Sequence, residues 1–480
     1  MKQIVNILRK LSRTKRAYAV FVLCATTVIA LPAQTFTTLF NFDKTDGAGP
    51  TGGLVQATNG YLYGTTDEGG TYGGGTVFKI TPFGRLTTLH TFDGVNGQYP
   101  RAGLVQAANG DLYGTTENGG ENGGGTVFQI TLSGMPTTLY SFCSLGVLCA
   151  DGEYPLYGTL VQAANGDLYG TTLGGGANSV GTIFKINPSG TLTTVSSFCF
   201  EGCGGDPFAG LVQATNGDFY GTAESGGANG HNGGTVFKIT PSGTLTTLYS
   251  FCSQSGCTDG ENPYAGLVQA TDGNFYGTTV GGGANGDGTV FRITPTGALT
   301  TLYSFDITDG ETPPAGLVQA TDGNLYGTTA YGGANGGGTI FQITPSGTLT
   351  TLYNFCSQSG CTDGQNPWAG LVQATDGNFY GTTNGGGANN DGTVFSLSVG
   401  LGRFVETRRT YGEVGALVEI LGTDLNGSTS VSFNGATAVF NVISSSLITT
   451  TVPAGATSGK IQVVTQSGTL SSNVPFRVLP

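Results

Sequence analysis

Residues of the types that catalyse reactions are few in this chain of 480 residues, and their spacing argues against a catalytic triad. Histidine occurs only at His90 and His231. His90 stands where four other copies of a repeated segment carry Tyr, which predicts a packing role, and His231 lies in a Gly/Asn-rich loop. No serine lies in a nucleophile-elbow sequence. No lysine or helix follows the Gly-rich loops, as a phosphate cradle requires.

Acidic residues recur at one place in the repeat, where they offer oxygen ligands. Five units place Asp before Gly and the other two have a polar residue nearby: Asp46, Asp151, Asp259, Asp309 and Asp363, with Asn96 and Asp206. Asp-Gly commonly forms a turn and does no more. No cofactor is predicted; the alternative to the turn is a ring of carboxylates that binds calcium or sugar hydroxyls. A glycosidase needs two carboxylates about 5–10 Å apart. Nothing in the sequence selects such a pair from Glu153, Glu261, Glu311 and the neighbouring Asp residues.

A recurrent Pro precedes the most variable position of the repeat. The residue after it differs in every unit: Thr51, Arg101, Leu156, Phe208, Tyr264, Pro314 and Trp368. Pro is tolerated at the first residue of a strand, which predicts that this position lies at the rim of one face. Aromatic side chains there can stack on sugar rings or anchor a protein partner; an unconstrained position beside a loop is the alternative. No catalytic residue is predicted. The candidate binding residues are Trp368, Tyr264, Phe208, Arg101, Asp259, Asp309 and Asp363.

Eight of the nine cysteines form close pairs: Cys143/Cys149, Cys199/Cys203, Cys252/Cys257 and Cys356/Cys361. An even count and local pairing, together with the export signal described below, predict disulfides. Zinc would prefer two intervening residues and a nearby His or second pair, whereas three to five residues intervene here. Each bridge closes a small loop and is worth only about 2 kcal/mol in the chain-entropy model. The bridges are therefore expected to stiffen individual loops.

The elements that position these residues are internal repeats. A Tyr-Gly-Thr motif that follows an Asn-Gly or Asp-Gly turn recurs seven times, at spacings of 50 to 56 residues. The sixth copy predicts four strands at 316–320, 325–329, 339–343 and 348–355, which tight turns join in pairs. Such a four-stranded antiparallel meander has the length of a propeller blade.

The two ends of the repeat region predict how it closes. A strand of the fourth type, 35–42, precedes the first unit, and the last unit stops after its third strand at 393–397. The N-terminal strand therefore completes the last unit, which closes a ring and hides its edge strands. We predict a seven-bladed β-propeller over 34–398; an open array of hairpin pairs is the alternative. The hairpin turns share one face. The Gly/Asn-rich loops, the loops between units and the cysteine pairs share the other, which is the candidate binding face.

Residues 1–33 have the three parts of an export signal. Six basic residues precede an apolar run at 17–31, and cleavage is expected near Ala33. The run is shorter than the ~20 residues of a membrane span, so a secreted or cell-surface protein without membrane insertion is favoured over an anchored one. Cleavage leaves 12 Lys and Arg against 30 Asp and Glu, a net charge of −18. This charge argues against nucleic acid and anionic membrane surfaces as partners.

A short Gly-containing linker, 399–402, separates the repeats from a segment with different patterning. Residues 403–480 contain six or seven short alternating strands, the pattern of a small β-sandwich. The runs VEILGTDLNGSTSVSFNGATAVFNV, ITTTVPAGATSGKIQVVTQSG and VPFRV resemble the IPT/TIG family of immunoglobulin-like domains. The resemblance implies an extracellular spacer or recognition module and no particular chemistry.

The repeats also resemble a known group. The runs GLVQATDGNxYGTT and GTVFKITPSGTLTTLYSF, within 35–398, are similar to exported bacterial tandem-repeat proteins sometimes called GloVer repeats. That group has no settled activity, so the resemblance implies no function. We expect an exported, non-catalytic binding or adhesion protein that presents its loop-rich face to a glycan or an extracellular protein. The alternative is a secreted carbohydrate-active hydrolase or lyase that uses rim carboxylates.

Overall fold

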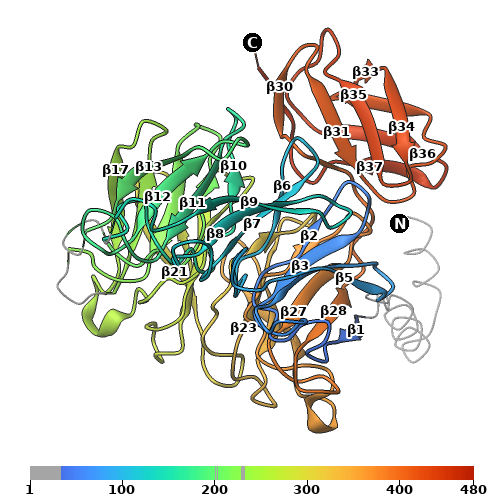
Figure 1. Ribbon diagram of the computed structural model, residues 1–480. Coiled ribbons are helices and arrows are strands. Elements are labelled where there is room, and N and C mark those ends of the chain that lie inside the picture. The colour runs from blue at the N-terminus through green and yellow to red at the C-terminus, as the bar shows by residue number, and fades with distance from the viewer. Residues whose placement is uncertain (1–33, 147, 200–201, 203, 229–232, 480) are drawn as a thin grey trace, which may run out of the picture.

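The computed structural model describes residues 34–146, 148–199, 202, 204–228 and 233–479. Seven four-stranded antiparallel sheets follow one another and a smaller β domain follows them (Figure 1), which confirms the all-β class. Two short 3-10 turns, η1 (Ser255–Cys257) and η2 (Ser359–Cys361), are the helical elements of the described residues. In that part of the chain no helix is long and apolar enough to cross a membrane. The expected export signal at 1–33 and His231 lie outside the described residues.

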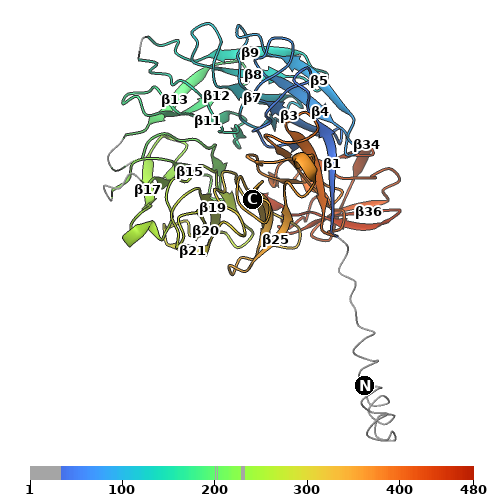
Figure 2. The same cartoon turned by 90° about the horizontal axis from the view of Figure 1, so that it is seen from below.

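The seven sheets share one plan of four strand positions, counted outward from the centre (Figure 2). The innermost strands are β2 (Val55–Gln56), β6 (Val105–Gln106), β10 (Val161–Gln162), β14 (Val212–Gln213), β18 (Val268–Gln269), β22 (Val318–Gln319) and β26 (Val372–Gln373). The second strands are β3 (Leu62–Thr66), β7 (Leu112–Thr116), β11 (Leu168–Thr172), β15 (Phe219–Ala223), β19 (Phe275–Thr279), β23 (Leu325–Thr329) and β27 (Phe379–Thr383). The third strands are β4 (Thr76–Ile80), β8 (Thr126–Ile130), β12 (Thr182–Ile186), β16 (Thr235–Ile239), β20 (Thr289–Ile293), β24 (Thr339–Ile343) and β28 (Thr393–Ser398). The outer strands are β1 (Thr35–Asn41), β5 (Leu86–Thr91), β9 (Pro136–Ser141), β13 (Leu192–Ser197), β17 (Leu245–Ser250), β21 (Leu299–Ser304) and β25 (Leu349–Asn354).

The Tyr-Gly-Thr motif lies on the second strand of each sheet, and this strand is buried along its whole length. In β23 the ring of Tyr326 is buried. A Cβ at Gly327 would lie only 2.6 Å from Cζ of Phe341, so glycine is required for the two strands to pack at this distance. The hydroxyl of Thr329 is hydrogen-bonded to that of Thr339 on the next strand at 2.9 Å. The motif therefore serves packing rather than chemistry.

The hydrophobic core consists of layers between neighbouring sheets. Tyr63 and Phe92 of the first sheet pack with Leu104, Leu112 and Phe128 of the second. Equivalent layers lie between the later sheets, and one of them joins the last sheet to the first. Each sheet thus buries both of its faces against its neighbours.

A glutamine on each innermost strand ties neighbouring sheets together. The backbone N–H of Thr58 donates to Gln106 Oε1 at 3.0 Å, and the same bond links each later unit to the next. The last unit is linked to the first in the same way, because the N–H of Thr375 donates to Gln56 Oε1 at 2.9 Å. β1 pairs antiparallel with β28, so the N-terminal strand completes the last sheet as the sequence predicts.

The C-terminal domain is a β-sandwich with a core that includes Val418, Ile448 and Phe476. One sheet has the order β29-β31-β35-β34, the other has the order β33-β32-β36-β37, and β30 pairs in parallel with β38. Its strands are β29 (Glu406–Thr407), β30 (Tyr411–Glu413), β31 (Leu417–Leu421), β32 (Ser430–Phe433), β33 (Ala436–Ala438), β34 (Phe440–Ser444), β35 (Leu447–Thr451), β36 (Ile461–Thr465), β37 (Gly468–Ser471) and β38 (Arg477–Leu479).

The sandwich lies against the face of the propeller that carries the hairpin turns, which we call the turn face (Figure 1). Side chains of the sandwich donate to carbonyl oxygens beside the innermost strands: Arg408 to Gln106 and Ala107 (2.9 Å to the latter), Ser446 to Thr58 (2.8 Å) and Arg477 to Thr215 (2.7 Å). Thr423 of the sandwich also shares a hydrogen bond with Thr375 of the last blade (2.8 Å), so the sandwich is docked on four blades. The opposite face, which carries the loops between units and the disulfides, is called the loop face.

Candidate functional site

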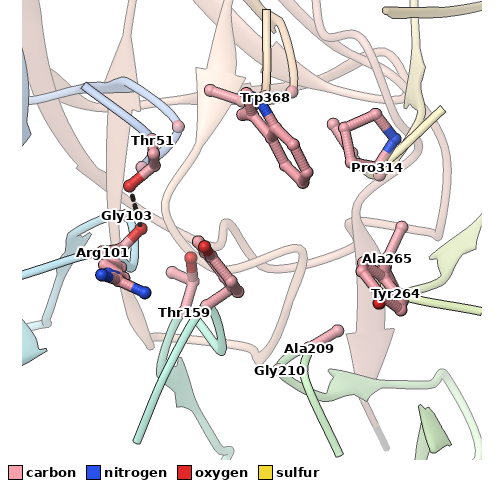
Figure 3. A pocket seen from close by; sticks show the side chains of 18 of the residues that line it. Thr51, Arg101, Gly103, Thr159, Ala209, Gly210, Tyr264, Ala265, Pro314 and Trp368 are labelled. Carbon is pink, nitrogen blue, oxygen red and sulfur yellow. Dashed lines mark hydrogen bonds between the residues drawn. The ribbon is translucent and has the colours of Figure 1, made fainter. Parts of the chain in front are cut away.

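A cavity of about 300 Å³ lies where the loops between units converge on the central axis, and residues from all seven blades line it. We call it the rim pocket (Figure 3). Each blade contributes backbone next to its innermost strand, such as Gly103, Gly210 and Gly370. A Cβ at Gly370 would lie 3.0 Å from the carbonyl oxygen of Gly316 on the preceding blade, so small residues allow the blades to approach closely at the floor of the pocket.

The walls of the pocket are built by the variable residue that follows the recurrent Pro. Trp368, Tyr264, Arg101, Thr51 and Pro314 all line the pocket, and in Figure 3 the labelled side chains come from different sides of one opening. The sequence thus identified a position whose side chains the fold does bring together.

Two further aromatic side chains support this wall. Phe208 stacks on Tyr264 with the ring centroids 4.7 Å apart and the planes 2° from parallel. It also stacks on Tyr157, at 6.1 Å and 15°. Tyr331 meets Trp368 edge to face at 6.3 Å. Tyr264 and Tyr157 line the pocket, while Phe208 lies between them without lining it.

Arg101 is the charged residue of the lining, and two carboxylates hold it. Its Nε lies 2.9 Å from Asp67 Oδ1 and 3.0 Å from Glu117 Oε2. Burial raises the pKa of both carboxyl groups, and the positive charge of Arg101 opposes that rise. The hydroxyl of Tyr157 lies close enough to Arg101 for its own pKa to be affected: burial raises it and the guanidinium lowers it.

A third carboxylate lies behind the aromatic wall. The hydroxyl of Tyr264 donates to Glu224, and burial together with this carboxylate raises the pKa of Tyr264 to about 12. Burial also raises the pKa of Glu224, although the hydrogen bond from Tyr264 opposes the rise. Tyr264 therefore stays a neutral donor at any physiological pH.

The third blade departs from the plan by one inserted residue. Other units read Pro-x-Ala-Gly-Leu or Pro-x-Gly-Gly-Leu, whereas this one has an extra position between Pro155 and Leu160. As a result Leu156 is buried away from the pocket, and Tyr157 lines it instead.

The inserted residue also affects a hydrogen bond between blades. In the first blade the Thr65 hydroxyl donates to a carbonyl of the next blade at 2.9 Å. The corresponding hydroxyl of Thr115, which faces the altered blade, has no hydrogen-bond partner among the described residues.

The aspartates of the repeat do not line the rim pocket. Asp259 and Asp363 are fully buried. Asp259 accepts hydrogen bonds from the Tyr249 hydroxyl (2.7 Å) and from the N–H and hydroxyl of Ser253 (3.0 and 2.7 Å). Asp309 accepts one from Tyr303. Burial alone would raise the pKa of Asp259, but these hydrogen bonds lower it. The aspartates thus hold their own loops, in agreement with the turn interpretation.

The sequence matches two known families. A model described as the Gloeobacter/Verrucomicrobia repeat matches residues 26–155, 146–258 and 253–438. The chain belongs to this repeat family. An IPT/TIG domain model matches residues 407–478, which include most of the sandwich. No curated protein matches the sequence significantly.

Two solved structures resemble this member of the repeat family over most of its length. One is a fungal alcohol oxidase of the AA5 family in complex with copper (TM-score 0.51, 13% identity, 93% of this chain and 99% of that chain). The other is the extracellular domain of a protein described as a hybrid two-component system from B. thetaiotaomicron (TM-score 0.51, 12% identity). This second match covers 92% of this chain and 58% of that chain. At such identities the likeness shows the fold alone.

Three of the four cysteine pairs of this repeat protein are disulfides, as predicted: Cys143–Cys149, Cys252–Cys257 and Cys356–Cys361. Cys203 lies outside the described residues, and so does its predicted bond with Cys199. Glu153 lies beside the first bridge and Glu261 beside the second. Because these cysteines are oxidised, the two clusters offer no thiolates to a metal. The disulfides and the IPT/TIG domain are consistent with an extracellular protein.

Sequence reasoning missed four residues of the site: Tyr157, Asp67, Glu117 and Glu224. The signal for the three carboxylates is present in the repeat, since each follows the second strand, at a position that varies between units. The occupants of that position are Asp67, Glu117, Leu173, Glu224, Val280, Ala330 and Asn384.

Proposed function

We propose that this chain is an exported, extracellular binding protein that holds a sugar unit of a glycan in the rim pocket. The observation that carries the proposal is the convergence of Trp368, Tyr264 and Tyr157 on one cavity that Arg101 also lines. Aromatic rings can stack on the apolar face of a sugar, and an arginine fork can donate to several hydroxyls. The export signal expected at 1–33 supports a secreted or cell-surface location.

The size of the pocket supports one sugar unit rather than a long segment. About 300 Å³ is at the lower end of the ~300–1,000 Å³ that small-molecule sites occupy. The pocket opens on the loop face, and the sandwich contacts the turn face. A glycan chain end or a branch can therefore reach the pocket from the side that the sandwich leaves uncovered.

The test is a binding measurement on the chain from residue 34 with a panel of oligosaccharides and polysaccharides. Trp368→Ala and Tyr264→Ala are expected to weaken binding at least ten-fold each, which corresponds to about 1.4 kcal/mol. Phe83→Ala is the matched control, because Phe83 is a highly exposed aromatic (94%) beside the sandwich and far from the rim pocket. Unchanged binding of every glycan that the wild type retains would contradict the proposal.

A secreted glycan hydrolase is the second candidate. Asp67 and Glu117 both lie about 3 Å from Arg101 Nε, so their nearest oxygens are at most about 6 Å apart, an upper limit that includes the ~5–5.5 Å of retaining glycosidases. Burial raises the pKa of both, as a general acid requires. Release of reducing ends from a retained glycan, lost in Glu117→Gln, would favour hydrolysis over binding alone. Retention without release would favour the binding protein.

A further inference from the structure

The positive charge of Arg101 in the rim pocket is balanced by two neighbouring carboxylates, those of Asp67 and Glu117. Arg101 is the only charged residue among those that line the pocket. The carboxylates of Asp67 and Glu117 both contact its Nε, and their side chains are only 15% and 19% exposed. Two partly desolvated carboxylates thus face one guanidinium, and the cluster has no excess positive charge to attract an anion.

The other side of the pocket adds negative charge. Tyr264 lines the pocket and donates its hydroxyl to Glu224, which lies behind it. An acidic ligand would have to give up water and enter a pocket that has Asp67 and Glu117 around Arg101 on one side and Glu224 behind Tyr264 on the other. Repulsion between such groups is screened less in a partly buried site than on an open surface.

The remaining donors of Arg101 suit neutral acceptors. Its Nε–H is donated to Asp67, which fixes the plane of the guanidinium. A guanidinium carries five N–H donors in one plane, so its terminal groups have more donors than the neighbouring Tyr157 hydroxyl accepts, and the others can serve oxygen acceptors such as sugar hydroxyls. Asp67 and Glu117 therefore act as positioning residues for Arg101.

We infer that the rim pocket selects neutral sugar units and discriminates against acidic ones such as uronates. The inference rests on the proposed glycan binding and adds the charge class of the ligand. Arg101 serves as a hydrogen-bond donor to hydroxyls, and the carboxylates that hold it exclude a second anion.

The test compares neutral and acidic oligosaccharides of equal length on the chain from residue 34. Oligomers of glucose, mannose and galactose represent the neutral class, and oligomers of galacturonate and mannuronate the acidic class. The tightest neutral oligomer is expected to bind at least ten-fold more tightly than any acidic one. In Asp67→Asn/Glu117→Gln this ratio is expected to fall at least ten-fold, mainly through tighter binding of the acidic oligomers. The control is Asp218→Asn, which removes a charge paired with Lys238 outside the rim pocket and should leave the ratio unchanged.

The outcomes separate this inference from the function on which it rests. Tighter binding of an acidic than of every neutral oligomer by the wild type overturns the selectivity and leaves glycan binding intact. Failure to bind any oligosaccharide overturns both. If the double variant does not fold, Glu224→Gln provides the same comparison with an expected change of about three-fold.

Discussion

Phe36 of the N-terminal strand connects two blades, so its removal tests how the propeller is held together. The Phe36 ring stacks on Tyr353 of the sixth blade, with centroids 3.8 Å apart and planes 6° from parallel. It also lies 5.4 Å from Phe395 of the seventh blade and 5.7 Å from Phe355 of the sixth. The perturbation is Phe36→Ala, which removes all three contacts and leaves the backbone pairing of β1 with β28 in place.

The expected loss follows from the burial of this ring and its partners. Truncation of a fully buried Phe costs about 3–5 kcal/mol, and Phe36 is half-buried. Half of that burial term together with the close stack on Tyr353, an aromatic pair worth about 0.5–1.5 kcal/mol, gives an expected loss of about 2–4 kcal/mol. The assay is urea unfolding, which yields the free energy from the midpoint and slope.

The matched control is Leu245→Ala. Leu245 occupies the equivalent position on the outer strand of the fourth blade, whose four strands are continuous in sequence. We expect a loss of about 1–2 kcal/mol there, since a half-buried Leu loses less than the 2–5 kcal/mol of a buried one. A loss below about 0.5 kcal/mol for Phe36→Ala, or one no larger than that of the control, would refute the reasoning.

Three further predictions concern packing, domain docking and pH. Gly327→Ala should cost about 1–3 kcal/mol in urea unfolding, because its Cβ would lie 2.6 Å from Phe341 Cζ; Gly402→Ala, with nothing within 4 Å, should cost close to nothing. Arg408→Ala removes hydrogen bonds to two carbonyls of the second blade, so protease cleavage at 399–405 should become faster while the propeller core stays resistant; unchanged cleavage would count against the docked sandwich. The lowered pKa of Asp259 means that its hydrogen bonds stabilise the fold above pH 4 and are lost as the pH falls through the lowered value. Asp259→Asn should therefore flatten the fall in stability below pH 4, and an unaltered acid profile would contradict this.

The positions of the strands in the repeats could be predicted closely, because turn-forming residues such as Asp-Gly and Pro-Ser-Gly mark where each strand begins or ends. In the sixth unit the second and third strands match the prediction to the residue, at Leu325–Thr329 and Thr339–Ile343. The innermost strand is shorter than predicted, Val318–Gln319 rather than 316–320. The reason is that Gly316 and Leu317 leave the sheet to line the rim pocket. In the sandwich the sequence predicts six or seven strands, whereas the described residues contain ten. Strands such as β29, β30, β33 and β37 have only two to four residues, too few to show an alternating pattern.

Positions whose residue differs between the seven repeat units indicated the site, whereas positions with the same residue in most units did not. Asp259 and Asp363 recur from unit to unit because each holds its loop through the same hydrogen bonds. Trp368 and Arg101 occupy a position that differs in every unit, and both line the rim pocket. Tyr157 could not be assigned from the sequence, because one inserted residue changes which side chain of the third blade points inward.

The central claim is that the rim pocket is the ligand site, and Trp368 allows a direct measurement. It is the only tryptophan in the sequence, so all tryptophan emission reports on this wall of the pocket. Titration with the neutral oligosaccharide that binds most tightly should change the emission saturably, with the same Kd that calorimetry gives. Tyr264→Ala should raise that Kd at least ten-fold. Calorimetric binding of the oligosaccharide with no change in Trp368 emission would place the ligand elsewhere and contradict the account.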